Sequence, residues 1–280
     1  LNFELMYFIN PINLKKLVKK NNYLTDNEGY EVEIVNNHIY LFEKKSNYSD
    51  NFGYQWNKFY KTQMDNSNLK FSSDRLKKIT NWDFNNLNNK NILEIGSGAG
   101  RFTRCILQKT TSNLYSVDFS DAVFANYKNN KEYINLSNLY LIKSSIYSMP
   151  LMDNVFDKVI CLGVLQHTPN IDESIKNLVK KTKPGGEIII DFYPLKGWWT
   201  KIHAKYLLRP LFKRINHRIL LKLIKCYVPF FYYLSVFFNK IGLGLLTRFF
   251  PICDIKTLPN VDNIIDWVVL DTFDMFSPEY

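Results

Sequence analysis

The chain has 280 residues, of which 46% are hydrophobic, so it can bury a large core, and its formal net charge is +10. Its length allows one large α/β domain or one domain with an elaborated insert. The four cysteines stand far apart without a C-x-x-C pair, so neither a zinc site nor a disulfide framework is expected. Because the N-terminus lacks an apolar stretch of signal-peptide length, we expect a reduced, cytoplasmic setting.

The positive charge is concentrated in one segment. Residues 195–250 contain eleven Lys and Arg and no Asp or Glu. The rest of the chain holds 25 basic and 26 acidic residues, a charge of −1. The basic character is therefore a property of this segment and needs its own explanation.

The first 50 residues carry two local patterns. Residues 13–20 predict a short helix, and the alternation over residues 31–43 predicts a β-hairpin that turns at Asn36 and Asn37. Neither pattern identifies a function.

Residues 51–79 are richer in aromatic side chains. Ser72 and Ser73 precede a helical pattern over residues 74–79 and predict a capped helix. Trp56 lies in the aromatic stretch 51–59, and two roles remain open for it: packing against the edge of a sheet, or capping a pocket.

The most informative stretch runs from Asn91 to Gly100, with the sequence N-I-L-E-I-G-S-G-A-G. An apolar run ends in three alternating glycines and is followed by a helical pattern, which predicts a buried strand, a tight turn and a helix start. Free N–H groups at such a helix start can face a ligand. A dinucleotide fingerprint needs its third glycine where Arg101 stands, so a turn without any ligand remains open for this stretch alone.

Strands and helices alternate after this turn. The predicted strands are 113–118, 139–143, 156–163 and 187–192, and the helices are 101–109, one starting at Asp121, and 171–181, with a turn at 184–186. This alternation predicts an α/β fold with a doubly wound, mostly parallel sheet and a ligand at the carboxyl ends of its strands. Asp118 ends strand 113–118, the second strand when the one before the glycine turn is counted as the first, and lies 18 residues beyond Gly100, where nucleotide-binding sheets hold ribose hydroxyls.

Five motifs then occur in order. They are L-E-I-G-S-G-A-G-R-F-T at 93–103, V-D-F-S at 117–120, Met149-Pro150 with Phe156-Asp157, L-Q-H-T-P at 165–169 and K-P-G-G at 183–186. In order and spacing they resemble the motifs of class I S-adenosylmethionine-dependent methyltransferases over about residues 90–193. Residues 52–56 and 271–280 also resemble, more loosely, a bacterial subgroup of that superfamily. The resemblance implies a Rossmann-like fold and S-adenosyl-L-methionine as the cofactor.

The resemblance also implies roles for single residues. The glycine loop would lie under the methionine and ribose portion of the cofactor, Glu94 would orient its amino-acid end, and Asp118 would hold the ribose hydroxyls. Phe119 would line the adenine, and Leu162 and Gly163 would face the sulfonium. The cofactor-binding residues implied are Glu94, Gly96, Ser97, Gly98, Gly100, Asp118, Phe119, Ser145, Ile146, Leu162 and Gly163.

Ser145 departs from the family pattern. It stands where the family usually has an Asp for the adenine amino group, which leaves a weaker neutral acceptor there. The backbone of Ile146 could still serve that contact.

His167 is the candidate catalytic residue. It follows the predicted fourth strand, and an imidazole is suited to accept a proton from a hydroxyl acceptor near neutral pH. A structural histidine that bonds a loop carbonyl is the open alternative.

The end of the chain departs from the family as well. After residue 261 there is one apolar run, 264–270, so we expect the C-terminal strand pair of the family to be missing, and a sheet edge to be uncovered. Because the chain begins with Leu1 and not Met, we expect it to be a fragment or to use an unusual start, and a truncated chain is the simplest explanation for the missing strand pair.

These observations divide the chain into four parts. Residues 1–85 form an N-terminal extension with a hairpin and helices that caps the pocket, and 86–194 form the cofactor-binding core. Residues 195–255 form a helical basic and aromatic insert, and 256–280 form an incomplete C-terminal segment.

The basic insert has two open roles. It is either a helical lid whose aromatic side chains cover the pocket, or an element that lies on an anionic membrane surface. Fourteen uncharged residues between Lys225 and Lys240 are too few to cross a bilayer, and Pro229 interrupts them, so we expect no membrane span. No RNA-binding module is recognisable, which disfavours nucleic acid as a partner.

The sequence therefore predicts a cytoplasmic or membrane-peripheral methyltransferase that methylates oxygen in a small-molecule, glycan-precursor or lipid-linked acceptor. Two alternatives stay open: a non-catalytic, methyltransferase-like binding or scaffold protein, and a membrane-peripheral quinone or lipid methyltransferase. The acceptor and the oligomeric state are not encoded in any motif.

Overall fold

The structure is a computed structural model that describes residues 7–45, 48–67, 69–134, 138–192, 203–258, 261 and 263–277. The chain divides into two compact units. The first takes in Leu1–Tyr60 and Ser72–Tyr193, and the second takes in Lys61–Phe71 and Pro194–Glu279. Each unit is described by itself. The four functional parts expected from the sequence stay a prediction.

The first unit is built on a nine-stranded sheet with the order β1-β2-β3-β4-β7-β6-β5-β8-β9. The strands are β1 (Val18–Lys20), β2 (Tyr23–Thr25), β3 (Glu31–Val35), β4 (Ile39–Leu41), β5 (Asn91–Ile95), β6 (Asn113–Asp118), β7 (Asn138–Lys143), β8 (Phe156–Cys161) and β9 (Thr182–Ile190). The helices of this unit are α1 (Asp50–Lys58), α2 (Phe71–Thr80, whose first residue belongs to the second unit), α3 (Arg101–Leu107), α4 (Ala122–Asn130) and α5 (Ile171–Lys181). From β4 to β9 all neighbouring strands are parallel, which confirms the predicted fold class.

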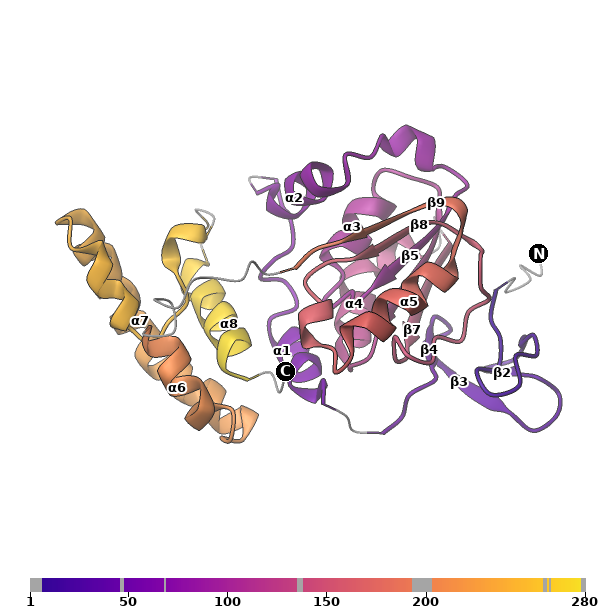
Figure 1. Ribbon diagram of the computed structural model, residues 1–280, viewed down its shortest axis with the longest axis horizontal. Coiled ribbons are helices and arrows are strands. Elements are labelled where there is room, and N and C mark those ends of the chain that lie inside the picture. Colours follow the sequence, from indigo (N-terminus) through magenta and orange to yellow (C-terminus); the bar gives the residue numbers. More distant parts are fainter. Residues whose placement is uncertain are drawn as a thin grey trace. The chain divides into compact units, whose positions relative to one another are not determined.

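The central strands are buried on both faces because alternate side chains enter two separate clusters. In β5, Leu93 packs in a cluster with Leu178 of α5, whereas Ile92 packs on the other face with Phe102 of α3. Figure 1 shows these strands between α3 and α4 on one side and α5 on the other. Strands with apolar side chains on both faces, as in β5, are typical of such a layer.

The N-terminal strands extend this sheet. The predicted hairpin is confirmed as β3 and β4, and Asn36 and Asn37 turn with φ of 51° and 62°. β4 then pairs in parallel with β7, a connection that no sequence pattern indicated. The predicted helix at residues 13–20 is wrong, because Asn13 accepts a hydrogen bond from the Lys15 N–H (2.9 Å) and the chain turns before β1.

Two further boundaries differ from expectation. Helix α2 begins at Phe71, so Ser72 and Ser73 lie inside its first turn and do not cap it. Strand β9 begins at Thr182, and the residues predicted as a turn form an irregularity in the strand, where Gly185 has a φ of 77° and the register against β8 shifts.

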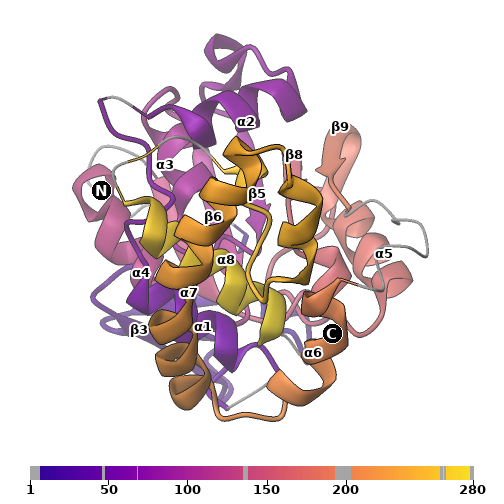
Figure 2. The ribbon, with the colours of Figure 1, turned by 90° about the vertical axis from the view of Figure 1, so that its left-hand side faces the viewer.

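The second unit consists of helices. They are α6 (Ala204–Phe212), α7 (His217–Lys240), α8 (Ile264–Phe276) and the short 3₁₀ turns η5 (Gly244–Phe249) and η6 (Ile255–Thr257). Figures 1 and 2 show α7 alongside α8, and the buried side chains of α7 include Leu220, Ile224 and Val228. Phe212 of α6 contacts Phe276 of α8, with ring centroids 4.6 Å apart.

The C-terminal apolar run belongs to α8 and not to a strand. Within the described residues no strand follows β9, which lies at the edge of the sheet, as the sequence predicted. Residues 278–280 of the predicted C-terminal motif lie outside the described residues.

Helix α7 corrects one expectation. It has 24 residues and includes Pro229, so the apolar helical segment is longer than expected from the sequence. By length and composition alone it is long and apolar enough to cross a membrane, although 28% of its most apolar window is buried against the rest of the chain. A proline inside a helix removes one hydrogen bond. Tertiary contacts offset that loss: Val228 is buried, and the Tyr227 hydroxyl donates to the Pro251 carbonyl (2.9 Å).

A buried polar network fixes the turn after β5. Glu94 Oε2 accepts hydrogen bonds from Thr103 Oγ1 (2.5 Å) and Ser116 Oγ (3.1 Å). Asn126 Nδ2 donates to the same two hydroxyls, at 2.9 and 3.0 Å, and to Ser97 Oγ at 3.1 Å. The network joins β5, β6, α3 and α4 at one point, directly under the glycine loop.

Glu94 is only 2% exposed, and its Oε1 atom has no hydrogen-bond partner among the described residues. Burial raises the pKa of this carboxyl to about 7, although the hydrogen bonds from Thr103 and Ser116 act in the opposite direction. The carboxyl therefore titrates near neutral pH.

This pKa predicts how stability depends on pH. Folded Glu94 keeps its proton up to about pH 7, whereas an unfolded chain releases it near 4.5, so folding takes up a proton between these values. The contribution of Glu94 to the free energy of unfolding therefore falls as the pH rises from 4.5 to 7. We expect Glu94→Gln to lack a fall of roughly 3 kcal/mol that wild type shows in urea unfolding between about pH 4.5 and about pH 8.

Glu31→Gln, at an exposed strand position, is the control and should follow the wild-type curve. Parallel curves for wild type and Glu94→Gln would contradict the raised pKa.

Candidate active site at the carboxyl ends of the central strands

The sheet order creates a switch point beside β5. The chain moves from β5 outward through β6 and β7, then returns to place β8 on the other side of β5. In doubly wound sheets the loops at such a point diverge and form a ligand crevice at the carboxyl ends of the strands. All the site residues predicted from the sequence follow or end β5, β6, β7 or β8, apart from Glu94, which lies within β5.

The glycine loop has a left-handed backbone at all three glycines, with φ of 70° at Gly96, 53° at Gly98 and 82° at Gly100. A Cβ at Gly96 would lie 2.1 Å from Val164 Cγ2, and one at Gly100 would lie 2.2 Å from Asn126 Oδ1. Glycine is therefore required at both positions, by conformation and by space.

Asp118 is bonded to this loop. Its Oδ2 accepts from the Gly98 N–H (2.8 Å), and its Oδ1 accepts from the backbone N–H (2.9 Å) and the hydroxyl (2.7 Å) of Ser120. Burial raises the pKa of the Asp118 carboxyl, against the opposing effect of these hydrogen bonds. A carboxylate has about four acceptor sites, so further donors can still be accepted.

The predicted adenine-side residues lie at the ends of β6 and β7. Phe119 contacts Tyr48, with ring centroids 5.3 Å apart, and Ile146 is buried. Ser145 Oγ accepts from the Tyr147 N–H (3.1 Å), which makes it a turn-forming residue as well as a weak acceptor. Ser144 donates its N–H to the Asp118 carbonyl (3.1 Å) and ties the two strand ends together.

Leu162 and Gly163 follow β8. Gly163 has a φ of 73°, and open space lies beside it, since a Cβ there would meet no atom within 4 Å. Its N–H donates to Asp191 Oδ1, and Asp191 Oδ2 accepts from Arg75 Nη2 (2.8 Å). Arg75 of α2 thus holds the acid that fixes the Gly163 peptide.

His167 ends the short 3₁₀ turn η3 (Leu165–His167). Its backbone N–H donates to the Val164 carbonyl (2.8 Å), and its ring lies edge-on to Phe52 of α1, with centroids 5.1 Å apart. The imidazole is thereby in contact with α1, and the His167 backbone is bonded to Val164.

Helix α1 covers the glycine loop. A Cβ added at Gly98 would lie 3.2 Å from the Trp56 indole, so the ring is in close reach of the loop. Asn57 Nδ2 donates to the Asp121 carbonyl (2.7 Å), and Gly53 leaves room for the Asp121 backbone, 2.9 Å from where a Cβ would stand. These contacts favour the pocket-capping role of Trp56 over simple packing at a sheet edge.

Three asparagines of α4 support the loop and were not singled out from the sequence. Asn129 Nδ2 donates to the Ala99 carbonyl (2.8 Å), and Asn130 Nδ2 donates to the Gly100 carbonyl (3.1 Å), while Asn126 joins the Glu94 network. Their spacing places all three on one face of α4, which is the signal that could have revealed them.

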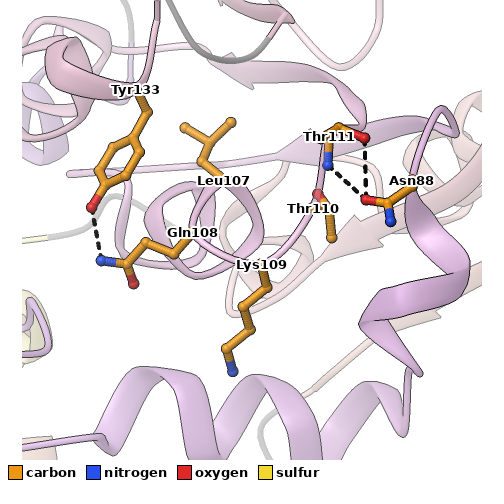
Figure 3. A pocket seen from close by; sticks show the side chains of 7 residues that line it. All are labelled: Asn88, Leu107, Gln108, Lys109, Thr110, Thr111 and Tyr133. Carbon is orange, nitrogen blue, oxygen red and sulfur yellow. Dashed lines mark hydrogen bonds between the residues drawn. The ribbon is translucent and has the colours of Figure 1, made fainter.

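A surface hollow of 670 Å³ lies elsewhere (Figure 3). It is lined by Asn88, Leu107, Gln108, Lys109, Thr110, Thr111 and Tyr133. It sits at the far end of α3 from the glycine loop, and four of its lining side chains are already paired, Gln108 with Tyr133 (2.9 Å) and Asn88 with Thr111. It plays no part in the site described above.

Among the described residues there is no group of three or more His, Cys, Asp or Glu side chains that could hold a metal ion.

A protein-family model matches part of the chain. Residues 93–190 match the model of a methyltransferase domain. The matched span begins within β5 and ends with β9, so it contains the glycine loop, Asp118, Gly163 and His167.

Curated relatives match over the same region. A tRNA U34 carboxymethyltransferase of Nautilia profundicola is 29% identical over 112 residues, 40% of this chain and 37% of that protein. A ubiquinone biosynthesis O-methyltransferase of Rickettsia bellii is 33% identical over 109 residues, 38% of this chain and 43% of that protein. The chain thus covers less than half the length of these relatives.

Among solved structures, a SAM-dependent methyltransferase from Aquifex aeolicus aligns with a TM-score of 0.41 and 17% identity, covering 56% of this chain and 86% of that one. The family model and the ordered motifs agree on the same residues. Residues 93–190 are therefore similar to a methyltransferase domain, in agreement with the class I S-adenosylmethionine-dependent resemblance of the motifs.

Proposed function

We propose that this chain is an S-adenosylmethionine-dependent methyltransferase that transfers the methyl group to an oxygen of a small-molecule, glycan-precursor or lipid-linked acceptor. One observation carries the proposal. The left-handed glycine loop and the Asp118 carboxylate are joined by a direct hydrogen bond from the Gly98 N–H (2.8 Å), inside the matched methyltransferase domain. This arrangement sets a close-approach backbone beside an acceptor suited to ribose hydroxyls.

The residues present fit the cofactor. Asp118 retains acceptor capacity for ribose hydroxyls, and the buried, unpartnered Oε1 of Glu94 offers an acceptor to an ammonium group. Open space beside Gly163 supports a sulfonium end near β8. Ser97, Phe119, Ser145, Ile146 and Leu162 complete the proposed set, with Ser145 contributing a weaker contact than an Asp would.

S-adenosylmethionine would supply an electrophilic methyl group on its sulfonium. The chain's part in such a displacement is mainly to align donor and acceptor, because fixed geometry replaces the entropy of a bimolecular encounter. His167 is proposed to accept the proton that a hydroxyl acceptor loses. The contact of its ring with Phe52 and the short turn η3 restrict the imidazole and would aim it.

The names of the relatives point to two acceptor classes. One relative is named for ubiquinone biosynthesis and another for tRNA, so the names divide between a lipid-soluble ring and a nucleic acid. We favour an oxygen acceptor because a histidine base after β8 serves a hydroxyl better than a nucleophile that needs no deprotonation.

A non-catalytic binding or scaffold protein is the second candidate function. The observation that favours it is Ser145, whose oxygen is partly engaged by the Tyr147 N–H where the family usually has an acid. Such a protein would bind the cofactor without turning over any acceptor.

Asp118 provides the first test. We expect the Asp118→Ala variant to weaken S-adenosylmethionine binding by roughly a hundredfold or more in calorimetry, since hydrogen bonds to a charged acceptor are lost. Asp172→Asn, at an exposed position on α5, is the matched control and should bind like wild type.

Because Asp118 also holds Gly98, both variants need melting curves to show that they fold. Wild-type protein that does not bind S-adenosylmethionine at millimolar concentration would contradict the proposal.

His167 provides the second test. We expect His167→Ala to lower methyl transfer to a panel of phenolic and other hydroxylated acceptors by roughly a hundredfold, with cofactor affinity within about threefold of wild type. Release of S-adenosylhomocysteine measures turnover, and calorimetry measures affinity. Loss of cofactor affinity in this variant would instead assign His167 a structural role against Phe52.

A further inference from the structure

Exposed apolar side chains gather in one segment. Of the 22 large hydrophobic residues that are exposed in the described part of the chain, 14 lie between Tyr206 and Phe249. Scattered exposed apolar residues need no explanation, but a contiguous apolar surface usually marks a binding surface.

On α7 these side chains form a stripe. The α7 stripe consists of Ile219, Leu223, Cys226, Phe230, Tyr233 and Phe237, spaced by four, three, four, three and four residues, so they follow one face of the helix. Phe230 is 65% exposed and Tyr233 66%. The stripe spans roughly 27 Å at the helical rise per residue. The opposite face is the one that packs inside the second unit, through Leu220, Leu221, Ile224 and Val228.

A row of cations borders the α7 stripe. The cation row consists of Arg218, Lys222, Lys225 and Lys240, all exposed. The first three each precede a stripe residue by one position, about 100° around the helix. The apolar surface and the cations continue into η5, where Leu245 is 68% and Phe249 61% exposed and Arg248 is also exposed.

A second copy of the chain fits this surface poorly. The spacing of the α7 stripe resembles a helix-pairing seam, but such seams are normally flanked by charges of opposite sign. Here the flanking positions carry cations, and residues 195–250 contain no Asp or Glu that could face them. Pairing two such helices would bring like charges together.

RNA also fits less well than lipid. Phosphates would satisfy the cation row, but aliphatic side chains such as Leu223 and Leu245 offer no flat ring on which a base could stack. A surface that needs both anions and a hydrocarbon layer matches the headgroup region of an anionic bilayer.

The helix is suited to lie in the interface. Lys222 and Lys225 stand in its first half, and its other face is already buried within the protein, so a crossing helix would place cations and protein contacts in hydrocarbon. An interfacial helix keeps its cations at the phosphates and immerses one face only.

We propose that the α7 stripe and η5 form a peripheral docking surface for an anionic lipid bilayer, with Phe230, Tyr233 and Phe237 at the boundary between headgroups and acyl chains and the cation row against lipid phosphates. This surface is independent of the proposed methyl transfer, because it rests on the second unit alone. It holds whether or not the site in the first unit is catalytic.

Cys226 allows a direct test, because it lies on the α7 stripe and is an exposed free thiol. Cys105 and Cys161 are buried, and burial raises the pKa of the Cys253 thiol to about 12, so a thiol-reactive dye should label Cys226 selectively. On the full chain we expect a polarity-sensitive dye at Cys226 to shift to the blue with phosphatidylcholine–phosphatidylglycerol vesicles. Phosphatidylcholine vesicles should shift it far less. The same dye on Lys180→Cys, in a Cys226→Ser background, should not respond.

Charge and apolar contributions can be separated by co-sedimentation with the same vesicles. Arg218→Gln/Lys222→Gln/Lys240→Gln should weaken partitioning roughly a hundredfold, and Phe230→Ser/Phe237→Ser at least about tenfold. All five positions are exposed, so folding should persist, as melting curves would verify. The matched controls on α5 are Lys176→Gln/Lys180→Gln and Val179→Ser, which should sediment like wild type.

Four results would overturn the proposal. The first is a dye signal that does not change with anionic vesicles, and the second is partitioning that neither the charge variant nor the apolar variant changes. The third is protein that resists alkaline carbonate extraction, which would mean that α7 crosses the bilayer. The fourth is Phe230→Ser/Phe237→Ser abolishing a dimer or tRNA binding while vesicle binding is absent, which would assign the surface to a second copy or to RNA.

Discussion

The glycine turn after β5 is the constraint on which the rest of the first unit depends. Its three left-handed glycines have little stability of their own, and a turn of this shape persists only where its surroundings hold it. Here the holding groups are polar and buried: the Glu94 carboxyl, the hydroxyls of Thr103 and Ser116, and the amide of Asn126. Since these groups come from β5, α3, β6 and α4, the loop can form only when the sheet and both helices are already in place. The shape of the site therefore depends on the same packing that fixes the order of the strands.

This arrangement has a cost that a purely structural network would avoid. A carboxyl buried at 2% exposure with one unpartnered oxygen is destabilised as an anion, and its pKa rises to about 7 as a result. An apolar residue at position 94 would remove that penalty. Its presence beside a close-approach backbone is what a ligand with a cationic group would require, because such a ligand supplies the missing partner. The unpartnered oxygen of this buried carboxyl is a reason to seek function at this point.

The sequence predicted the central sheet well because its strands are buried on both faces and are rich in apolar residues, as in β6, where the predicted and observed bounds agree. It predicted β1 and β2 poorly because each has three residues, too few for a period to appear, and because Asx turns compete with the helical pattern before them. For the site, the glycines and Asp118 were readable from spacing. Asn126, Asn129, Asn130 and Arg75 were not, because their roles are contacts between segments far apart in the chain. The length expected for the apolar segment of α7 was too short, because Pro229 was taken to interrupt it. In the structure the helix continues through Pro229, with buried side chains on both sides of that residue.

The two units also differ in how their side chains are used, and this difference bears on what selects the acceptor. In the first unit, the polar side chains described beside the glycine loop point inward and hold the backbone by hydrogen bonds. Few of them are therefore available to recognise an acceptor. In the second unit the exposed face of α7 carries apolar and cationic side chains with no acidic residue beside them in the sequence. A surface of that composition recognises a class of environment and not a single molecule, since hydrocarbon and phosphate occur in every anionic bilayer. Docking of the proposed kind would act by location: it would raise the concentration of lipid-soluble molecules near the chain without any contact that recognises their structure. Docking and chemistry are then separable properties of one chain, because residues that hold the glycine loop have no part in the α7 stripe, and the stripe has none in the loop.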